Sequence, residues 1–169
     1  MSEPPADILR RLKPIPTHTG HPTTTPHDID GVAPDGTALR IDVVGAAAPA
    51  LLLFLSAGCL GCRDLWEGLT DLHDGLAGAA RLVVVTRSPG EESPEAVTAL
   101  AGDAPGTTGT ELVMSTAAYR DYRVAGPPFL TVVAADGVRT ESVAWGLEQT
   151  LQTALGALHD PPHRPARHG

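Results

Sequence analysis

The chain has 169 residues, of which 42% are hydrophobic and 4% aromatic, and its formal net charge is −8 at pH 7. This length favours one domain with terminal extensions, and it is enough to bury a core made mainly of aliphatic side chains. The negative charge argues against a nucleic acid or an anionic membrane surface as partner. No run of about 18 apolar residues occurs and the start lacks an apolar stretch, so we expect neither a membrane span nor a signal peptide.

Composition divides the chain into three parts. Residues 1–27 are rich in Pro, Thr and His, and their prolines forbid a long helix, so we expect an N-terminal arm. Residues 28–158 carry regular hydrophobic patterns and are predicted to form the folded domain. Residues 159–169 are again rich in Pro and His and are predicted to be a loose C-terminal tail.

Hydrophobic periodicity predicts the elements of this domain. Residues 29–32 and 38–43 flank a turn at Asp35-Gly36 and are expected to form a hairpin. Five consecutive apolar residues at 51–55 indicate a fully buried strand, and leucines at helical spacing then predict one helix that runs to about Leu76. The later predicted elements are a buried strand at 81–86, a helix at 94–101 capped by Ser93, a flexible stretch at 102–109, a short strand at 111–114, a brief helix after Ser115, a hairpin of strands 129–133 and 138–143, and a helix at 149–158.

This order of elements predicts the fold class. Strands alternate first with helices and then with a hairpin, which indicates an α/β domain with one central mixed sheet flanked by helices. The first hairpin adds an N-terminal β-hairpin extension to that sheet. Open α/β sheets usually place their functional site at the carboxyl end of a central strand, and the strand at 51–55 is the candidate.

Two cysteines, the only ones in the chain, lie at that point. Cys59 comes where the buried strand gives way to the predicted helix, and Cys62 follows almost one helical turn later. A helix N-terminus stabilises a thiolate through its unpaired N–H groups and its dipole. We therefore expect Cys59 to be the exposed nucleophile and Cys62 to be the more buried thiol that resolves a mixed disulfide. A C-x-x-C pair at a strand-to-helix junction indicates a redox site.

The sequence resembles the thioredoxin-like superfamily, and within it the thiol-disulfide oxidoreductases of the TlpA/ResA-like group. The junction around Cys59-Leu60-Gly61-Cys62 carries part of this resemblance. The segment 124–130, Val-Ala-Gly-Pro-Pro-Phe-Leu, is similar to the V-x-G-x-P segment of the family, and the Asp136-Gly137 hairpin follows it directly. The early Asp35-Gly36 hairpin is typical of the TlpA/ResA-like branch. The similarity covers roughly residues 28–158.

The resemblance implies exchange of electrons between the Cys59–Cys62 pair and protein thiols or disulfides, without a cofactor or a metal. It also implies an electron donor that the sequence does not name. Pro128 takes the place of the cis-proline that faces the cysteines, and Pro127 and Gly58 would border the same substrate groove. We expect a cytoplasmic location; an extracytoplasmic one stays open for a chain with a membrane anchor.

Three positions depart from the family pattern. Gly58 stands where an aromatic residue usually precedes the first cysteine. Leu53 stands where thioredoxin keeps a buried acid that accepts a proton from the second cysteine. Pro127 has no N–H to pair with the backbone of an incoming peptide. These departures predict slower or more selective exchange.

Other functions of this fold stay open. A thiol peroxidase of the peroxiredoxin class has Thr or Ser three residues, and Pro seven residues, before its reactive cysteine; Ser56 matches this pattern and Leu52 does not. A redox-inactive binding module is favoured by Gly58 and Pro127 and opposed by the retained cysteine pair. A structural zinc site needs four ligands, and no second cysteine pair exists to complete it.

Overall fold

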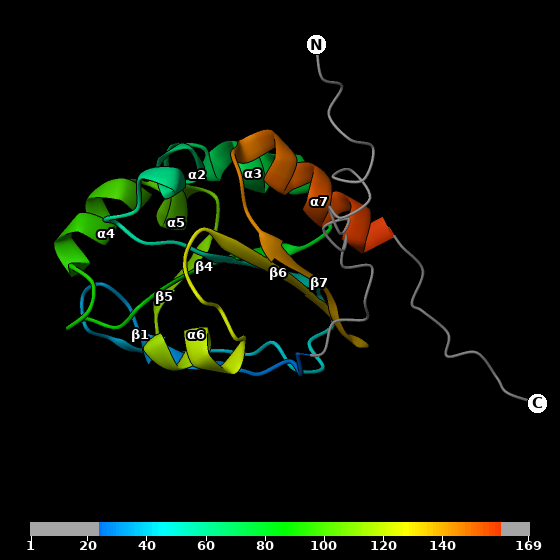
Figure 1. Ribbon diagram of the computed structural model, residues 1–169, viewed down its shortest axis with the longest axis horizontal. Coiled ribbons are helices and arrows are strands. Elements are labelled where there is room, and N and C mark those ends of the chain that lie inside the picture. Colours follow the sequence, from blue (N-terminus) through cyan, green and yellow to red (C-terminus); the bar gives the residue numbers. More distant parts are fainter. Residues whose placement is uncertain (1–23, 160–169) are drawn as a thin grey trace, which may run out of the picture.

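The computed structural model describes residues 24–159, and within this range it has one seven-stranded mixed sheet (Figure 1). The strand order is β2-β1-β5-β4-β3-β6-β7. The pairs β3–β4 and β4–β5 are parallel, and the remaining pairs are antiparallel. The strands are β1 (Ile29–Val32), β2 (Ala38–Ile41), β3 (Ala50–Phe54), β4 (Arg81–Thr86), β5 (Glu111–Met114), β6 (Phe129–Ala134) and β7 (Gly137–Val143).

Helices cover both faces of the sheet (Figure 1). Most of them lie on one face, and α6 lies on the other. Within residues 24–159, no helix is long and apolar enough to cross a bilayer. The helices are the 3₁₀ turn η1 (Leu60–Cys62), α2 (Arg63–Glu67), α3 (Leu69–Leu76), α4 (Pro94–Ala101), α5 (Ala104–Thr107), α6 (Thr116–Asp121) and α7 (Leu147–His159).

Strand β3 supplies both cores of the domain. Successive residues of a strand point to opposite faces, so Leu53 joins the core under α2, α3 and α7, whereas Phe54 joins the core under α6. All five residues of β3 are buried. On the α6 side the ring of Phe54 meets that of Tyr119 edge-on, with centroids 5.1 Å apart. The mixed sheet, the flanking helices and the N-terminal hairpin confirm the predicted fold class.

The single helix predicted from the cysteines to Leu76 is wrong in one respect. It ends at Leu76, but it is divided into η1, α2 and α3, and Gly68 joins the last two with φ −99° and ψ 14°. A Cβ atom at Gly68 would lie only 2.8 Å from a methyl carbon of Leu147 in α7. The break therefore lies where the first turn of α7 packs against the backbone between α2 and α3.

The predicted flexible stretch at 102–109 is also partly wrong. It contains the short helix α5, with Pro105 in its first turn. Proline is tolerated there because the first N–H groups of a helix have no partner within it.

The arm predicted at 1–27 and the tail predicted at 159–169 fall mostly outside the described residues. Of the arm, the hydroxyl of buried Thr24 donates a hydrogen bond to Glu141 Oε2 at 2.6 Å, and the backbone N–H of His27 donates to Tyr122 Oη at 2.9 Å. These residues therefore pack against β7 and the end of α6. His159 is the last residue of α7.

Asp28 fastens the start of β1 to the segment after β2. Its Oδ1 accepts hydrogen bonds from the backbone N–H groups of Val43 at 2.7 Å and Val44 at 2.9 Å, and its Oδ2 lies 3.0 Å from the guanidinium of Arg40. These two backbone hydrogen bonds, followed by the charge of Arg40, hold the pKa of the Asp28 carboxyl below its usual value. A lowered pKa stabilises the fold above the unfolded pKa of about 3.9, and this contribution is lost as the pH falls through the folded pKa.

We therefore expect Asp28→Ala to lower the free energy of unfolding by about 1–2 kcal/mol near neutral pH, because two charge-assisted hydrogen bonds are lost. The deficit should shrink in urea titrations as the pH falls below the unfolded pKa of about 3.9 and through the lowered pKa of the folded carboxyl. Asp30→Ala is the matched control, since Asp30 pairs with the same Arg40 but its side chain is 73% exposed. A deficit that stayed constant with pH would contradict this role of the carboxylate.

Thr131 in β6 has a fully buried hydroxyl for which the described residues offer no hydrogen-bond partner. Thr131→Val replaces this hydroxyl by a methyl group of similar shape, so we expect unfolding free energy to rise by about 1 kcal/mol. The midpoint of thermal unfolding should rise by about 3 °C. Thr110→Val is the control, because the buried Thr110 hydroxyl lies 2.6 Å from that of Thr108; this variant should lose stability.

Candidate active site

The turn before the cysteines is fixed by three contacts from other elements. Leu55, directly after β3, donates its N–H to Val85 O at 3.0 Å. The Tyr119 hydroxyl of α6 donates to Leu55 O at 2.8 Å, and the indole Nε1 of Trp66 donates to Ser56 O at 3.0 Å. Two aromatic side chains, one from each face of the sheet, therefore hold the carbonyl groups that precede the C-x-x-C segment.

A carboxylate that sequence reasoning missed lies in this region. Glu92 follows β4, and its Oε1 accepts the backbone N–H of Ala57 at 3.0 Å. The carboxyl ends of parallel strands meet at one edge of a sheet, so an acid soon after β4 could have been predicted near the end of β3. Burial is the largest cause that raises the pKa of the Cys62 thiol, and the negative charge of Glu92 adds to it. A carboxylate of the β4–α4 loop thus contacts the turn before the cysteines, while Leu53, at the position where thioredoxin has a buried acid, is fully buried.

The two cysteines are free thiols that differ in exposure. Cys59 is half-buried and precedes the 3₁₀ turn η1, whereas Cys62 is fully buried and donates its N–H to Cys59 O at 3.2 Å. Burial, and next a hydrogen bond with Cys59, raise the pKa of the Cys62 thiol to about 12. Cys62 is therefore protonated at neutral pH, and Cys59 is the accessible sulfur of the pair.

The segment before β6 lies against Cys59. The peptide bond between Pro127 and Pro128 is cis. The Cys59 thiol donates a long hydrogen bond to Pro127 O at 3.7 Å, and a Cβ atom at Gly61 would lie 3.6 Å from Pro128 Cδ. The pairing of β6 with β7 extends to Pro128, just before β6, because its carbonyl accepts a hydrogen bond from the N–H of Ala144 at 3.0 Å. The structure thus brings the predicted groove residues Pro127 and Pro128 to the cysteines.

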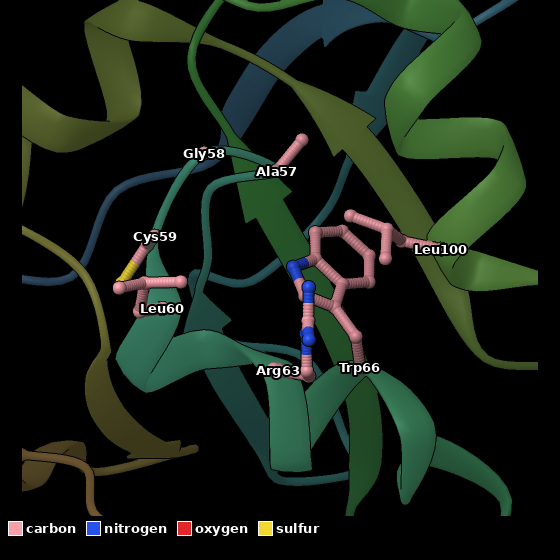
Figure 2. Close-up of a pocket in the computed structure, with 7 residues that line it drawn as sticks. All are labelled: Ala57, Gly58, Cys59, Leu60, Arg63, Trp66 and Leu100. Carbon is pink, nitrogen blue, oxygen red and sulfur yellow. The ribbon is translucent and has the colours of Figure 1, made fainter.

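Gly58, the third predicted groove residue, lies on the other side of Cys59. It is exposed, and a Cβ atom built there would meet nothing within 4 Å. The space beside it is a small hollow of about 50 Å³ (Figure 2). Its lining residues are Ala57, Gly58, Cys59, Leu60, Arg63, Trp66 and Leu100. The missing aromatic side chain therefore leaves an open space next to the accessible cysteine.

Comparisons with known proteins bear on the fold. No family model and no curated protein matches the sequence. The thioredoxin domain of a thiol-disulfide oxidoreductase from Bacteroides vulgatus matches with a TM-score of 0.61 and 15% identity, over 83% of this chain and 99% of that one. A secreted Mycobacterium tuberculosis disulfide oxidoreductase homologous to E. coli DsbE gives 0.57 and 15%, over 77% and 93%. Peroxidoxin BcpB from M. tuberculosis gives 0.59 and 19%, over 79% and 93%.

The protein has a thioredoxin-like fold. This fold agrees with the resemblance found in the sequence. The C-x-x-C segment of this thioredoxin-like protein follows the carboxyl end of β3. Among residues 24–159, no group of three or more His, Cys, Asp or Glu side chains could hold a metal ion. Trp66 is 3% exposed and belongs to the core, whereas Trp145, which follows β7, is 70% exposed.

Proposed function

We propose that this thioredoxin-like protein is a thiol-disulfide oxidoreductase that acts on protein substrates through Cys59 and Cys62. The observation that carries the proposal is the arrangement of the two thiols: one is accessible, and the other is fully buried one turn later. A pair of this kind can form one covalent bond with a partner and then release it. The neighbours that are thiol-disulfide oxidoreductases support the same chemistry.

In the reducing direction, the Cys59 thiolate attacks one sulfur of a substrate disulfide. A bond forms between Cys59 Sγ and that sulfur, and the substrate's S–S bond breaks; the leaving sulfur keeps the electron pair and takes a proton from water. Cys62 then gives its proton to water and attacks Cys59 Sγ; the mixed disulfide breaks, and the second substrate sulfur leaves with the electron pair and takes a proton from water. Two electrons pass to the substrate, and the protein is left with a Cys59–Cys62 disulfide that a separate donor must reduce.

A redox titration tests this proposal. The protein is equilibrated in thiol–disulfide buffers between about −350 and −100 mV, the span of known dithiol proteins, and the free thiols are alkylated and counted by mass. We expect a single two-electron transition that adds two alkyl groups together. A pair that stays reduced over the whole range would overturn the proposal and favour a redox-inactive binding module.

A thiol peroxidase is the second candidate. Peroxidoxin BcpB has the same fold, and Ser56 lies three residues before Cys59 as in peroxiredoxins. In that reaction Cys59 would be oxidised to a sulfenic acid while hydrogen peroxide is reduced to water, and Cys62 would then close the disulfide with loss of a second water. Leu52 stands in place of the expected proline, which favours disulfide exchange. Stopped-flow reaction of the reduced protein with hydrogen peroxide separates the two, since an exchange enzyme should react slowly.

Location decides the direction of electron flow. The cytoplasmic location expected from the sequence has no support among these neighbours, and one of them is described as secreted. We therefore favour an extracytoplasmic site of action, where a reductase needs a dedicated electron donor. The electron donor and the substrates can be identified from the mixed disulfides that they form with the Cys62→Ser variant.

A further inference from the structure

The hollow beside Gly58 adjoins a larger one. The second hollow has a volume of about 410 Å³ and lies where α2 and α3 face α4 and α5. Trp66 and Leu100 belong to the walls of both hollows, and Figure 2 shows their side chains next to each other. We call the two hollows together the α2–α4 groove. The second hollow is lined by Trp66, Glu67, Leu69, Thr70, Leu100, Ala101, Gly102, Asp103 and Ala104.

The α2–α4 groove begins at the accessible cysteine. Cys59 lies in the wall of the first hollow, and Gly58 leaves its entrance open. The middle of the groove is apolar, because Trp66 and Leu100 form the part that the two hollows share. A chain joined to Cys59 through a disulfide could therefore continue over Trp66 without crossing a side chain at position 58.

The opposite side of Cys59 offers little to a peptide backbone. Pro127 and Pro128 have no N–H, so neither can donate the hydrogen bond that pairs an extended peptide with this segment. The carbonyl oxygen of Pro127 is already within 3.7 Å of the Cys59 thiol. A substrate peptide can therefore form few backbone hydrogen bonds on this side of Cys59. Contacts of its side chains with the α2–α4 groove become more important for recognition.

The two ends of the α2–α4 groove carry opposite charges. Arg63 is the charged residue in the lining of the first hollow, whereas Glu67 and Asp103 line the second. All three are exposed, and within residues 24–159 none of them forms an ion pair. Arg63 and Glu67 are four residues apart in α2, or about 6 Å along its axis, which corresponds to about two residues of an extended peptide.

We propose that the α2–α4 groove binds the segment of a protein substrate that adjoins its reactive cysteine. This segment has an acidic side chain next to the cysteine, opposite Arg63, then an apolar side chain over Trp66 and Leu100, and then a basic side chain opposite Glu67 and Asp103. The assignment rests on the proposed disulfide exchange and names the substrate class for it.

Matched peptides test this assignment. Each short peptide holds one cysteine as a mixed disulfide with thionitrobenzoate. Counted outward from the cysteine, its flanking segment is acidic–apolar–basic or, with the same composition, basic–apolar–acidic. Both orders are made with the segment before and after the cysteine. When Cys59 attacks the peptide sulfur, the S–S bond breaks and coloured thionitrobenzoate leaves. For one placement of the segment, the acidic–apolar–basic peptide should react about fivefold faster at low salt, and the preference should fall at about 0.5 M salt.

Variants assign the preference to the groove. Arg63→Glu should reverse the preference for an acidic side chain next to the cysteine. Gly58→Trp, which fills the first hollow, should abolish the preference for one order of the segment. Arg120→Glu is the matched control: it makes the same charge change on α6, on the other face of the sheet, and should leave the preference intact. Each peptide rate is divided by the rate with the neutral probe 2-hydroxyethyl disulfide, so that changes in the intrinsic reactivity of Cys59 cancel.

The outcomes separate the two proposals. If the neutral probe reacts but the peptides of opposite order react equally in both placements, the groove assignment is overturned and disulfide exchange stands. If the preference survives both Arg63→Glu and Gly58→Trp, the segment binds elsewhere and the assignment is also overturned. If no disulfide reacts at all, the exchange function fails, and the groove assignment falls with it.

Discussion

Replacement of Cys59 by serine is expected to lower the rate of disulfide exchange by at least about a thousandfold, because a serine hydroxyl cannot replace the thiolate nucleophile. Cys62 cannot take over the attack, since it is fully buried and its thiol is protonated at neutral pH. Reduction of insulin or of 2-hydroxyethyl disulfide, followed with a chemical reductant as electron source, measures the loss.

The Cys62→Ser variant should behave in the opposite way. Cys59 can still attack, but no thiol resolves the product, so a mixed disulfide between Cys59 and the partner accumulates. Mass spectrometry of the complexes trapped in cell extracts should locate the partner's mixed disulfide on Cys59. The complexes should disappear when the sample is reduced. If Cys59→Ser and Cys62→Ser trapped partners equally, the assignment of attacking and resolving roles would be wrong.

The same difference between the thiols predicts an order of alkylation. Iodoacetamide reacts with thiolates, so in the reduced native protein it should label Cys59 first and should label Cys62 only after unfolding. Peptide mapping after partial labelling shows the order. This serves as the control for both serine variants, because it reports the accessibility of each sulfur without a substrate.

Local patterns predicted most of the fold. The apolar run of β3 and the Asp-Gly turns of both hairpins are sequence features that determine their own structure, as are the caps of α4 and α6. Ser93 Oγ accepts the N–H of Ala96, and Ser115 Oγ that of Ala118, at the helix starts that their sequence positions indicated. In each case the interacting groups lie within a few residues, so the pattern that predicts the element also contains its partners.

The errors come from partners distant in the chain. The break at Gly68 depends on Leu147, and the carboxylate that reaches Ala57 N–H belongs to Glu92. Neither contact is visible in a local pattern. The sequence did place Cys59, Cys62, Pro127, Pro128 and Gly58 in one site, because the resemblance brought a known arrangement with it. It did not predict the groove beyond Gly58, whose walls come from the four helices α2, α3, α4 and α5.

Gly31→Ala is expected to be among the most destabilising conservative substitutions in the domain. A Cβ atom at Gly31 in β1 would overlap the backbone oxygen of Met114 and would lie 2.8 Å from a methyl carbon of Val113, both in β5. Because the closest atom belongs to the backbone, no side-chain rotation relieves the clash, and the strands must separate. We expect the free energy of unfolding to fall by about 3 kcal/mol in urea titrations.

Gly156→Ala in α7 is the matched control. A Cβ atom there meets nothing within 4 Å, and alanine favours a helix over glycine, so stability should rise by about 0.5–1 kcal/mol.

The slope and midpoint of the urea transition show whether the Gly31→Ala variant unfolds as one unit or loses its N-terminal hairpin first. Ile29 of β1 and Ile41 of β2 share a core with Phe54 and Tyr122, so the N-terminal hairpin is part of the cooperative domain. The slope of the urea transition should therefore stay near that of the wild type, while its midpoint falls. A smaller slope at an unchanged midpoint would show instead that the hairpin detaches first. In that case β3, β4 and the cysteines would form an independently stable unit, and Cys59 would keep its reactivity toward iodoacetamide.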